Sequence, residues 1–316
     1  MSFLERASYQ IRDSCTKKHV IVVEKSTVPV KCAEMISNIL HSSSEEGTNF
    51  YVISNPEFLS EGNAVENILN PDRVIIGGKN KAENDSLAIR ELERIYSSWV
   101  DVSRIISTDY YSAEISKLTS NAFLAQRVAS INSISAICEL SGANILEVSY
   151  AVGMDSRIGN KFLMPSLGFG GSCFKKDLLC LVYICESLGL KEVADYWHQV
   201  LAVNNYQKKR FVRLIVRTLS ENIFEKCICI FGASFKKDTS DSRESPSIYV
   251  IKKLLREGAK IKVYDPCVDP SDLFENIRQS LDEKIEFENQ FAFLKDPYLA
   301  TESADAIVIC TEWDIF

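Results

Sequence analysis

The chain has 316 residues, of which 46% are hydrophobic and 25% are charged, and its net charge is −7. This composition is typical of a globular protein with about two or three domains. The acidic balance, without a block dense in lysine and arginine, argues against a nucleic-acid-binding protein. No uncharged apolar run approaches the length of a membrane span, and the charged N-terminus does not resemble a signal peptide.

The cysteines indicate a reducing environment. The chain has ten cysteines and three histidines, and no two cysteines form a C-x-x-C pair. We therefore expect no metal site and a cytoplasmic location. Nine of the ten read as small buried hydrophobic residues, and Cys173 is the exception.

The first third of the chain alternates short apolar segments with helical patterns, which predicts a parallel α/β sheet. Pro29 suits the first turn of a helix that runs to Ile39. The predicted strands are 19–24, 50–54, 73–78 and 104–108, and a second helix is predicted over 82–98.

The middle third is predicted to be helical. Residues 109–141 have apolar residues at helical spacing and no proline or glycine, which predicts one long helix. A second helix follows Cys173, and a third covers about 191–221. Helices of this length often bridge domains or pack across an oligomer interface.

A second α/β unit follows. Its predicted strands are 226–232, 260–265 and 304–310, with a helix over Pro246–Glu257. Nowhere does a G-x-G-x-x-G motif lie between a strand and a helix.

Cys173 follows a glycine-dense loop and opens a predicted helix. The partial positive charge of a helix N-terminus stabilises a thiolate, and Lys175 and Lys176 add to it. Asp177 lies one turn further on the same face, where it could hold a water or transfer a proton. The alternative is a loop cysteine that merely precedes a helix.

Two pairs of polar residues are candidates for supporting chemistry. Lys117 and Asn121 share a helix face and could stabilise an oxyanion, although a solvated polar face, which Glu114 also fits, is the alternative. Glu57 and Glu61 follow a strand, where a carboxylate can act as a general base. The alternative is two surface acids.

Two loops could bind a ligand. Ser26 and Thr27 follow the carboxyl end of the first predicted strand and could face the same crevice as the glutamates. Lys236, Lys237 and Arg243 lie beside a turn of small residues that could hold a phosphate, or they form a solvated basic loop.

Taken together and in this order, these segments resemble the UDP-glucose 6-dehydrogenase family, within the UDP-glucose/GDP-mannose dehydrogenases. The resemblance covers nearly the whole chain. Relatives that act on other nucleotide sugars share the GGSC-type loop, but the continuous match favours UDP-glucose. It rests on EKSTVPV, NPEFLSEGNAVENILNPDRVIIGG, KLTSNAFLAQR, INSISAICE, GMDSRIGNKFL, GFGGSCFKKD, FKKDTSDSRESPS and ICTEWD.

The resemblance implies an α/β fold with two partial Rossmann-like domains around a central long-helix domain. Residues 1–108 would be the remainder of an NAD-binding domain, 109–224 a helical dimerisation domain and 225–316 an incomplete UDP-binding domain. The implied activity is the NAD-dependent, four-electron oxidation of UDP-glucose to UDP-glucuronate. The implied partner is a second copy, because the family forms dimers that build hexamers.

The resemblance also implies roles. Cys173 would be the nucleophile, forming a thiohemiacetal and then a thioester. Lys117 and Asn121 would stabilise oxyanions, Asp177 would activate water, and Glu57, with Thr27 nearby, would act in thioester hydrolysis. Substrate binding would fall to Phe58, Leu59, Arg157, Lys161, Phe162, Leu163, Gly168, Phe169, Gly170 and Lys236. Cofactor binding would fall to Ser26, Thr27, Glu61, Cys173, Lys176 and Arg243.

The sequence departs from the family at two positions and at both ends. Met164 replaces a lysine found in some members, and Lys175 replaces a common glutamine or proline. Family members begin with a strand and a glycine-rich loop and continue past TEWD, so we expect this chain to lack most of its NAD site. The alternatives are a non-catalytic subunit that serves oligomerisation and a dehydrogenase for another nucleotide sugar.

Overall fold

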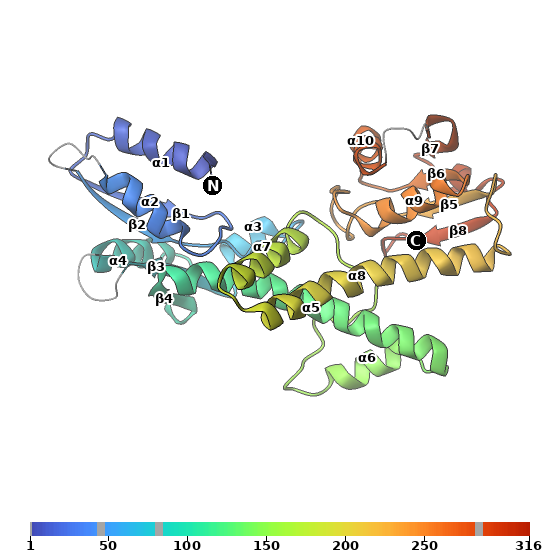
Figure 1. The fold of residues 1–316 in the computed structure, drawn as a ribbon, viewed down its shortest axis with the longest axis horizontal. Helices are drawn as coiled ribbons and strands as arrows, with labels where there is room; N and C mark the ends of the chain where they lie inside the picture. The colour runs from blue at the N-terminus through green and yellow to red at the C-terminus, as the bar shows by residue number, and fades with distance from the viewer. Residues whose placement is uncertain (1, 43–47, 80–84, 282–286) are drawn as a thin grey trace. The chain divides into compact units, whose positions relative to one another are not determined.

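The computed structural model describes residues 2–42, 48–79, 85–281 and 287–316 (Figure 1). The chain forms two compact units, each built on one four-stranded sheet. Unit 1 consists of residues 1–121 and 183–190, and unit 2 of residues 122–182 and 191–316. The helices α5 (Tyr110–Ser141) and α7 (Phe174–Ser187) contribute residues to both units.

The sheet of unit 1 has the order β1-β2-β3-β4. β1 pairs with β2 and β3 with β4 in parallel, but β2 and β3 are antiparallel through the single pair Ser54 and Gly77. The expectation of a wholly parallel sheet is therefore wrong here. The segment 55–73 does not cross the sheet, so β3 starts at the edge where β2 ends. The strands are β1 (His19–Glu24), β2 (Asn49–Ser54), β3 (Val74–Gly78) and β4 (Ile105–Asp109).

Helices cover both faces of this sheet. Phe50 and Val52 of β2 are buried with the apolar residues of α2 (Cys32–His41), whereas Ile53 is buried with those of α4 (Asp85–Tyr96). A strand buried on both faces reads as a continuous apolar run, which is why it could be recognised from sequence.

Three details of unit 1 differ from expectation or extend it. Pro29 precedes α2 instead of lying in its first turn. The expected helix over 82–98 is α4, and residues 82–84 lie outside the described residues. The N-terminal segment, for which no element was predicted, is the helix α1 (Ser2–Ser14), and it packs against α2. The short elements are α3 (Ala64–Leu69) and η1 (Val102–Arg104).

The long helices of unit 2 were predicted correctly. Besides its part of α5, the unit contains the predicted helix α8 (Lys191–Thr218). It also contains α6 (Ile145–Gly153), which was not predicted from the sequence. The structure shows no described helix long and apolar enough to span a membrane.

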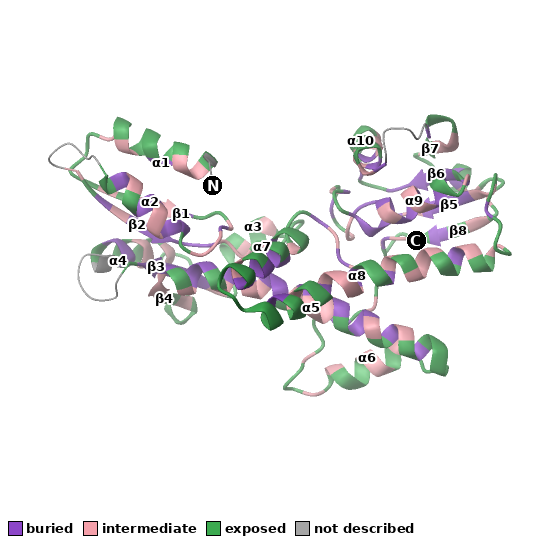
Figure 2. Cartoon of the chain, in the orientation of Figure 1, coloured by how far each residue is buried: buried purple, intermediate pink, exposed green. Residues whose placement is uncertain are grey.

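The sheet of unit 2 is wholly parallel, in the order β7-β6-β5-β8. Ile228, Ile230, Ile261 and Val263 form one buried cluster with α9, and Figure 2 shows β5 and β6 mostly buried. The α/β class is confirmed. The elements are β5 (Cys227–Phe231), α9 (Pro246–Arg256), β6 (Lys260–Tyr264), α10 (Pro270–Ser280), η2 (Glu288–Gln290), β7 (Phe291–Phe293), α11 (Pro297–Thr301) and β8 (Ala306–Ile309).

Candidate active site

The loops after β1 and β2 leave the same edge of the sheet in unit 1. The two strands are parallel and in register, with Glu24 opposite Ser54. Asn55, which is buried, ties the loops together. Its Oδ1 accepts hydrogen bonds from Lys25 Nζ at 3.1 Å and from the Tyr96 hydroxyl at 2.6 Å. Sequence reasoning missed Asn55, whose only signal was its position directly after the strand.

An ion pair at this edge joins two predicted site residues. Lys117 Nζ of α5 lies 3.2 Å from Glu57 Oε1, and the lysine side chain is only 5% exposed. Glu57 is further fixed because its Oε2 accepts the backbone N–H of Leu59 at 2.6 Å. A buried ammonium with one carboxylate partner is a preorganised positive centre, which suits the stabilisation of a developing negative charge.

The polar face of α5 is buried rather than solvated. Lys117 and Asn121 are both buried, so the alternative of a solvent-exposed polar face is wrong. Glu114 is buried as well, and it has a structural role at the start of α2. Its carboxylate oxygens each accept a backbone N–H, from Lys31 and from Ala33, both at 2.7 Å. Glu114 therefore caps a helix N-terminus.

The remaining predicted residues of unit 1 differ in exposure. Phe58 packs under two cations, with the Arg73 guanidinium 3.9 Å and Lys117 Nζ 5.3 Å from its ring centroid. Thr27 is half-buried. Ser26, Leu59 and Glu61 are exposed.

Glu24 is a buried carboxyl at the end of β1. It is 5% exposed, and neither of its oxygens has a hydrogen bond of ordinary geometry among the described residues. Burial raises the pKa of Glu24 to about 7; the nearby backbone amide of Ser26 opposes the shift and the Glu114 carboxylate adds to it. Desolvation explains the direction, because an unpaired buried carboxylate loses its hydration.

In unit 2, Cys173 is exposed and lies at the N-terminus of α7. Its carbonyl accepts the backbone N–H of Asp177 at 2.9 Å, which makes Cys173 the capping residue of the helix. Its Sγ lies 3.6 Å from the hydroxyl of Ser172. An accessible sulfur at this position benefits from the unpaired N–H groups of the first turn, so the geometry favours a nucleophile.

The charged residues that follow Cys173 in the sequence have different partners. The side chain of Asp177 is buried, and Lys176 Nζ lies 3.8 Å from its Oδ1. Lys175 instead pairs with Glu244, at 2.8 Å and 3.0 Å from the two carboxylate oxygens.

The glycines of the loop before Cys173 are needed for contacts within the protein. A Cβ atom on Gly168 would lie 2.4 Å from Oδ1 of Asn204, and one on Gly170 would lie 2.6 Å from the carbonyl oxygen of Glu244. The family resemblance implies that Gly168 and Gly170 take part in binding the substrate. Close approach of the backbone to protein atoms is their demonstrated use, and sugar binding stays a prediction.

The segment that carries several predicted substrate residues is held by an arginine that sequence reasoning missed. Arg127 of α5 donates to the backbone carbonyls of Ile158, Gly159 and Lys161, at 3.0, 2.7 and 2.8 Å. In this segment Leu163 is buried, whereas Arg157, Lys161 and Phe162 are exposed. Arg157 pairs with Asp155 and holds the pKa of that carboxyl below its usual range.

The cations of the loop after β5 are partly neutralised. Lys237 pairs with Asp314 at 2.8 Å, and Arg243 pairs with Asp241 at 2.9 Å. Lys236 lies over the ring of Phe235, 5.7 Å from its centroid. The cations of this loop already have acidic or aromatic neighbours. They therefore match neither a phosphate-binding turn with free cations nor a fully solvated basic loop.

Asp265 orders this edge of the second sheet. Its buried carboxylate accepts the backbone N–H groups of Ala233, Ser234, Cys267 and Val268, and the indole N–H of Trp313. The loops after β5, β6 and β8 therefore converge on one side chain, which was not singled out from sequence.

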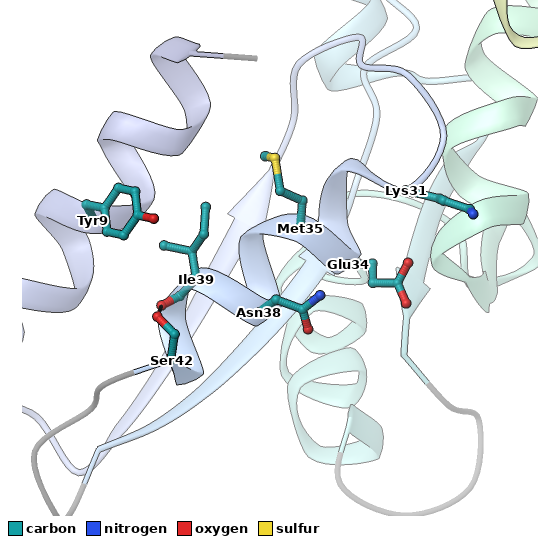
Figure 3. Close-up of a pocket in the computed structure, with 7 residues that line it drawn as sticks. All are labelled: Tyr9, Lys31, Glu34, Met35, Asn38, Ile39 and Ser42. Carbon is teal, nitrogen blue, oxygen red and sulfur yellow. Dashed lines mark hydrogen bonds between the residues drawn. The ribbon is translucent and has the colours of Figure 1, made fainter. Parts of the chain in front are cut away.

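A cavity of about 430 Å³ lies in unit 1 (Figure 3). Tyr9 comes from α1, and the other lining residues come from α2 and its flanks. Among the lining residues of this cavity there are no predicted site residues. They are Tyr9, Lys31, Glu34, Met35, Asn38, Ile39 and Ser42.

Known proteins match the whole length of the chain. Three profiles of the UDP-glucose/GDP-mannose dehydrogenase family match it in succession: the NAD binding domain over residues 1–100, the central domain over 111–206 and the UDP binding domain over 229–316. The UDP-glucose 6-dehydrogenase of Caenorhabditis elegans is 53% identical over 298 residues, which are 94% of this chain and 62% of that protein.

UDP-glucose 6-dehydrogenase 4 of Oryza sativa subsp. japonica is 48% identical over 329 residues, covering 100% of this chain and 67% of that protein. The solved UDP-glucose dehydrogenase of Pyrobaculum islandicum superposes with a TM-score of 0.84 at 32% identity and covers 99% of this chain and 67% of that one. The chain spans 62% and 60% of the length of the curated relatives from Caenorhabditis elegans and Mus musculus.

Proposed function

The chain belongs to the UDP-glucose/GDP-mannose dehydrogenase family, and on that premise we propose that it oxidises UDP-glucose to UDP-glucuronate with NAD. The exposed thiol of Cys173 at the N-terminus of α7 is the observation that carries the proposal. A fixed and accessible sulfur is what a covalent mechanism at the sugar carbon requires.

We propose that Cys173 acts after the alcohol has been oxidised to an aldehyde. Its sulfur adds to the aldehyde carbon, and the carbonyl electron pair moves to the oxygen, giving a thiohemiacetal. Each of the two oxidations would remove a hydride from the sugar carbon, for which bound NAD supplies the acceptor. The second removal, with loss of the hydroxyl proton, would turn the thiohemiacetal into a thioester. Water then attacks the thioester carbon, the carbon–sulfur bond breaks, and the thiol returns to Cys173 as the acid leaves.

The polar residues of α5 and of the β2 loop have matching roles in the proposal. Lys117 and Asn121 would stabilise the oxyanions of the addition and hydrolysis steps, because a buried cation and an amide favour negative charge on oxygen. Glu57, paired with Lys117 at 3.2 Å, would act with Thr27 in thioester hydrolysis. Asp177, buried in the first turn of α7, would help to activate the water.

The groups at the carboxyl edge of β1 and β2 fit one end of the cofactor. Ser26 and Thr27 offer hydroxyls and Glu61 a carboxylate, which suit the hydrogen-bonding groups of a nicotinamide riboside. Lys176 and Arg243 of unit 2 would contribute cations. The G-x-G-x-x-G loop that usually binds the pyrophosphate does not occur in this sequence.

The substrate would be bound by two loops. Arg157, Lys161, Phe162 and Leu163 follow α6, and Gly168, Phe169 and Gly170 precede Cys173. Phe58 and Leu59 would meet the sugar and Lys236 a phosphate. The residue ranges 1–108, 109–224 and 225–316 are proposed as the NAD-binding, helical and UDP-binding domains.

We also propose a homo-oligomer located in the cytoplasm. All ten cysteines are free thiols, which suits a reducing compartment. Leu140 of α5 is 91% exposed, and Tyr150 and Met154 at α6 are also largely exposed. These exposed apolar side chains support a helical face that a second copy of the chain would cover. An oligomerising subunit without activity is the second candidate, and exposure of these apolar residues favours it equally.

A turnover assay separates the two candidates. The 316-residue chain is mixed with UDP-glucose and NAD, and NADH absorbance is compared between Cys173→Ala and Cys267→Ala, the second variant removing another exposed thiol. For a chain that turns over, we expect about two NADH per UDP-glucuronate, lost in Cys173→Ala and kept in Cys267→Ala. A folded chain without turnover would favour the non-catalytic subunit, and turnover in Cys173→Ala would exclude the proposed nucleophile.

A further inference from the structure

Side-chain amides, rather than neighbouring loops alone, hold the backbone of the segment before Cys173. Asn204 of α8 is 4% exposed. Its Oδ1 accepts the N–H of Phe169 at 2.8 Å, and its Nδ2 donates to the carbonyl of Phe169 at 3.1 Å. The Asn204 amide thus bonds to both backbone groups of Phe169, as a neighbouring β-strand would.

Two further amides hold the start of the same segment. Gln207, one turn after Asn204, donates from Nε2 to the carbonyl of Ser166 at 2.8 Å. Asn132 of α5 accepts the N–H of Ser166 on its Oδ1, also at 2.8 Å, and is 1% exposed. We call Asn132, Asn204 and Gln207 the amide clamp. Polar side chains this deeply buried cost stability unless they are hydrogen-bonded, so each contact is strongly maintained.

Arg210 supports the amide clamp through its contact with Gln207. Arg210 donates to Oε1 of Gln207 at 2.9 Å and to the carbonyl of Ser135 at 3.1 Å, and it pairs with Glu139. These contacts restrict the rotamer of Gln207, so its amide is oriented before it meets the loop.

A short chain of contacts links the clamp to the thiol. Phe169, whose backbone Asn204 holds, is buried, and its ring packs edge-to-face on Phe174 with centroids 5.8 Å apart. Phe174 is the first residue of α7 and follows Cys173 directly. On the other side, the N–H of Gly171 donates to the carbonyl of Arg243 at 3.1 Å. Cys173 therefore lies between two anchored points.

We propose that Asn204, assisted by Gln207 and Asn132, is a positioning residue for Cys173, which rests on the proposed role of that thiol as a nucleophile. The amides act through Phe169 and do not touch the sulfur. When the clamp is lost, Phe169 and Phe174 are free to shift, and Cys173 is no longer held in one place at the N-terminus of α7.

The test measures thiol reactivity, which needs neither NAD nor turnover. The 316-residue chain is treated with iodoacetamide at pH 7, and labelling rates of Cys173 and Cys267 are followed by peptide mass spectrometry. For Asn204→Ala we expect the rate at Cys173 to fall about fivefold, with Cys267 unchanged as the internal reference. Asn205→Ala, at an exposed neighbour on α8, is the matched control and should leave both rates unchanged.

Gln207→Ala keeps the test decisive if Asn204→Ala does not fold. It removes one hydrogen bond to the loop, and we expect a smaller fall, of about twofold, in a variant with wild-type circular dichroism. An unchanged ratio of the Cys173 to the Cys267 rate in a folded clamp variant would overturn the proposal. If the clamp variants behave as expected while the wild-type chain lacks turnover, only the proposed function fails.

Discussion

The two units prepare their functional groups in different ways. In unit 1, the cation Lys117 is buried and already paired with Glu57. In unit 2, the thiol of Cys173 is exposed, and the surrounding backbone, rather than the sulfur, makes the firm contacts. On the proposed roles, the cation is positioned by burial and pairing, whereas the proposed nucleophile, which must stay accessible, is positioned through its main chain.

The largest expected effect comes from removing the buried cation. Lys117→Met keeps the length of the side chain but deletes the ammonium, so we expect turnover to fall about 100-fold. Lys226→Met, which breaks the exposed pair with Asp305, is the control and should leave turnover unchanged. Turnover within threefold of wild type in Lys117→Met would show that the buried pair serves folding alone.

A pair of glycine substitutions tests how tightly the loop of unit 2 is held. Gly168→Ala places a Cβ 2.4 Å from Asn204 Oδ1 in a residue with φ of +124°, and we expect a loss of about 3 kcal/mol in the free energy of unfolding. Gly159→Ala also has positive φ but meets nothing within 4 Å, and should cost about 1 kcal/mol. Urea denaturation measures both, and equal losses would contradict a close-packed loop.

The pH dependence of stability tests the buried carboxyl of unit 1. The pKa of Glu24 is raised from 4.5 to about 7, so the folded state binds its proton more tightly than the unfolded state does. Its contribution is complete below pH 4.5 and is lost as the pH rises to 7, an effect of about 3 kcal/mol. Glu24→Gln should remove this part of the slope in urea titrations between pH 5 and 8, and an unchanged slope would exclude the buried, uncharged carboxyl.

The smallest expected effect is at an exposed ion pair of unit 2. Lys175→Gln breaks the contact with Glu244, but both side chains are about half exposed, at 53% and 50%. We expect a change of at most about 0.5 kcal/mol in the free energy of unfolding, measured by thermal melting. A loss above 1.5 kcal/mol would mean that side-chain pairing, and not only the backbone, holds the start of α7.

Local patterns in the sequence were enough to predict most elements, because the strands are continuous apolar runs and the long helices contain no breakers. The helix α1 was missed although Leu4, Ala7 and Ile11 recur at helical spacing, because most of its other residues are polar or charged. β7, with only three residues, is too short to show a period. The antiparallel pairing of β2 and β3 depends on the path of residues 55–73, which no local pattern encodes.

Residue types in the sequence were enough to propose the candidate site residues, but not to predict which of them are in contact. The pair between Glu57 and Lys117 joins residues far apart in the chain, and only the fold brings them together. Asn55 and Asn204 were missed because a buried amide looks like any surface amide until its backbone partners are known. The glycine-dense loop before Cys173 was recognised from the sequence. Only the structure shows that Asn204 and the carbonyl oxygen of Glu244 leave no room for a side chain there.

The central question for this chain is whether Cys173 forms a bond to the sugar carbon. The chain is incubated with the C6 aldehyde form of UDP-glucose, without NAD, and iodoacetamide labelling is then measured at Cys173 and at Cys267. We expect the aldehyde to protect Cys173 by forming the thiohemiacetal and to leave Cys267 labelled as before. Labelling of Cys173 that stays unchanged at every aldehyde concentration would exclude Cys173 as the nucleophile.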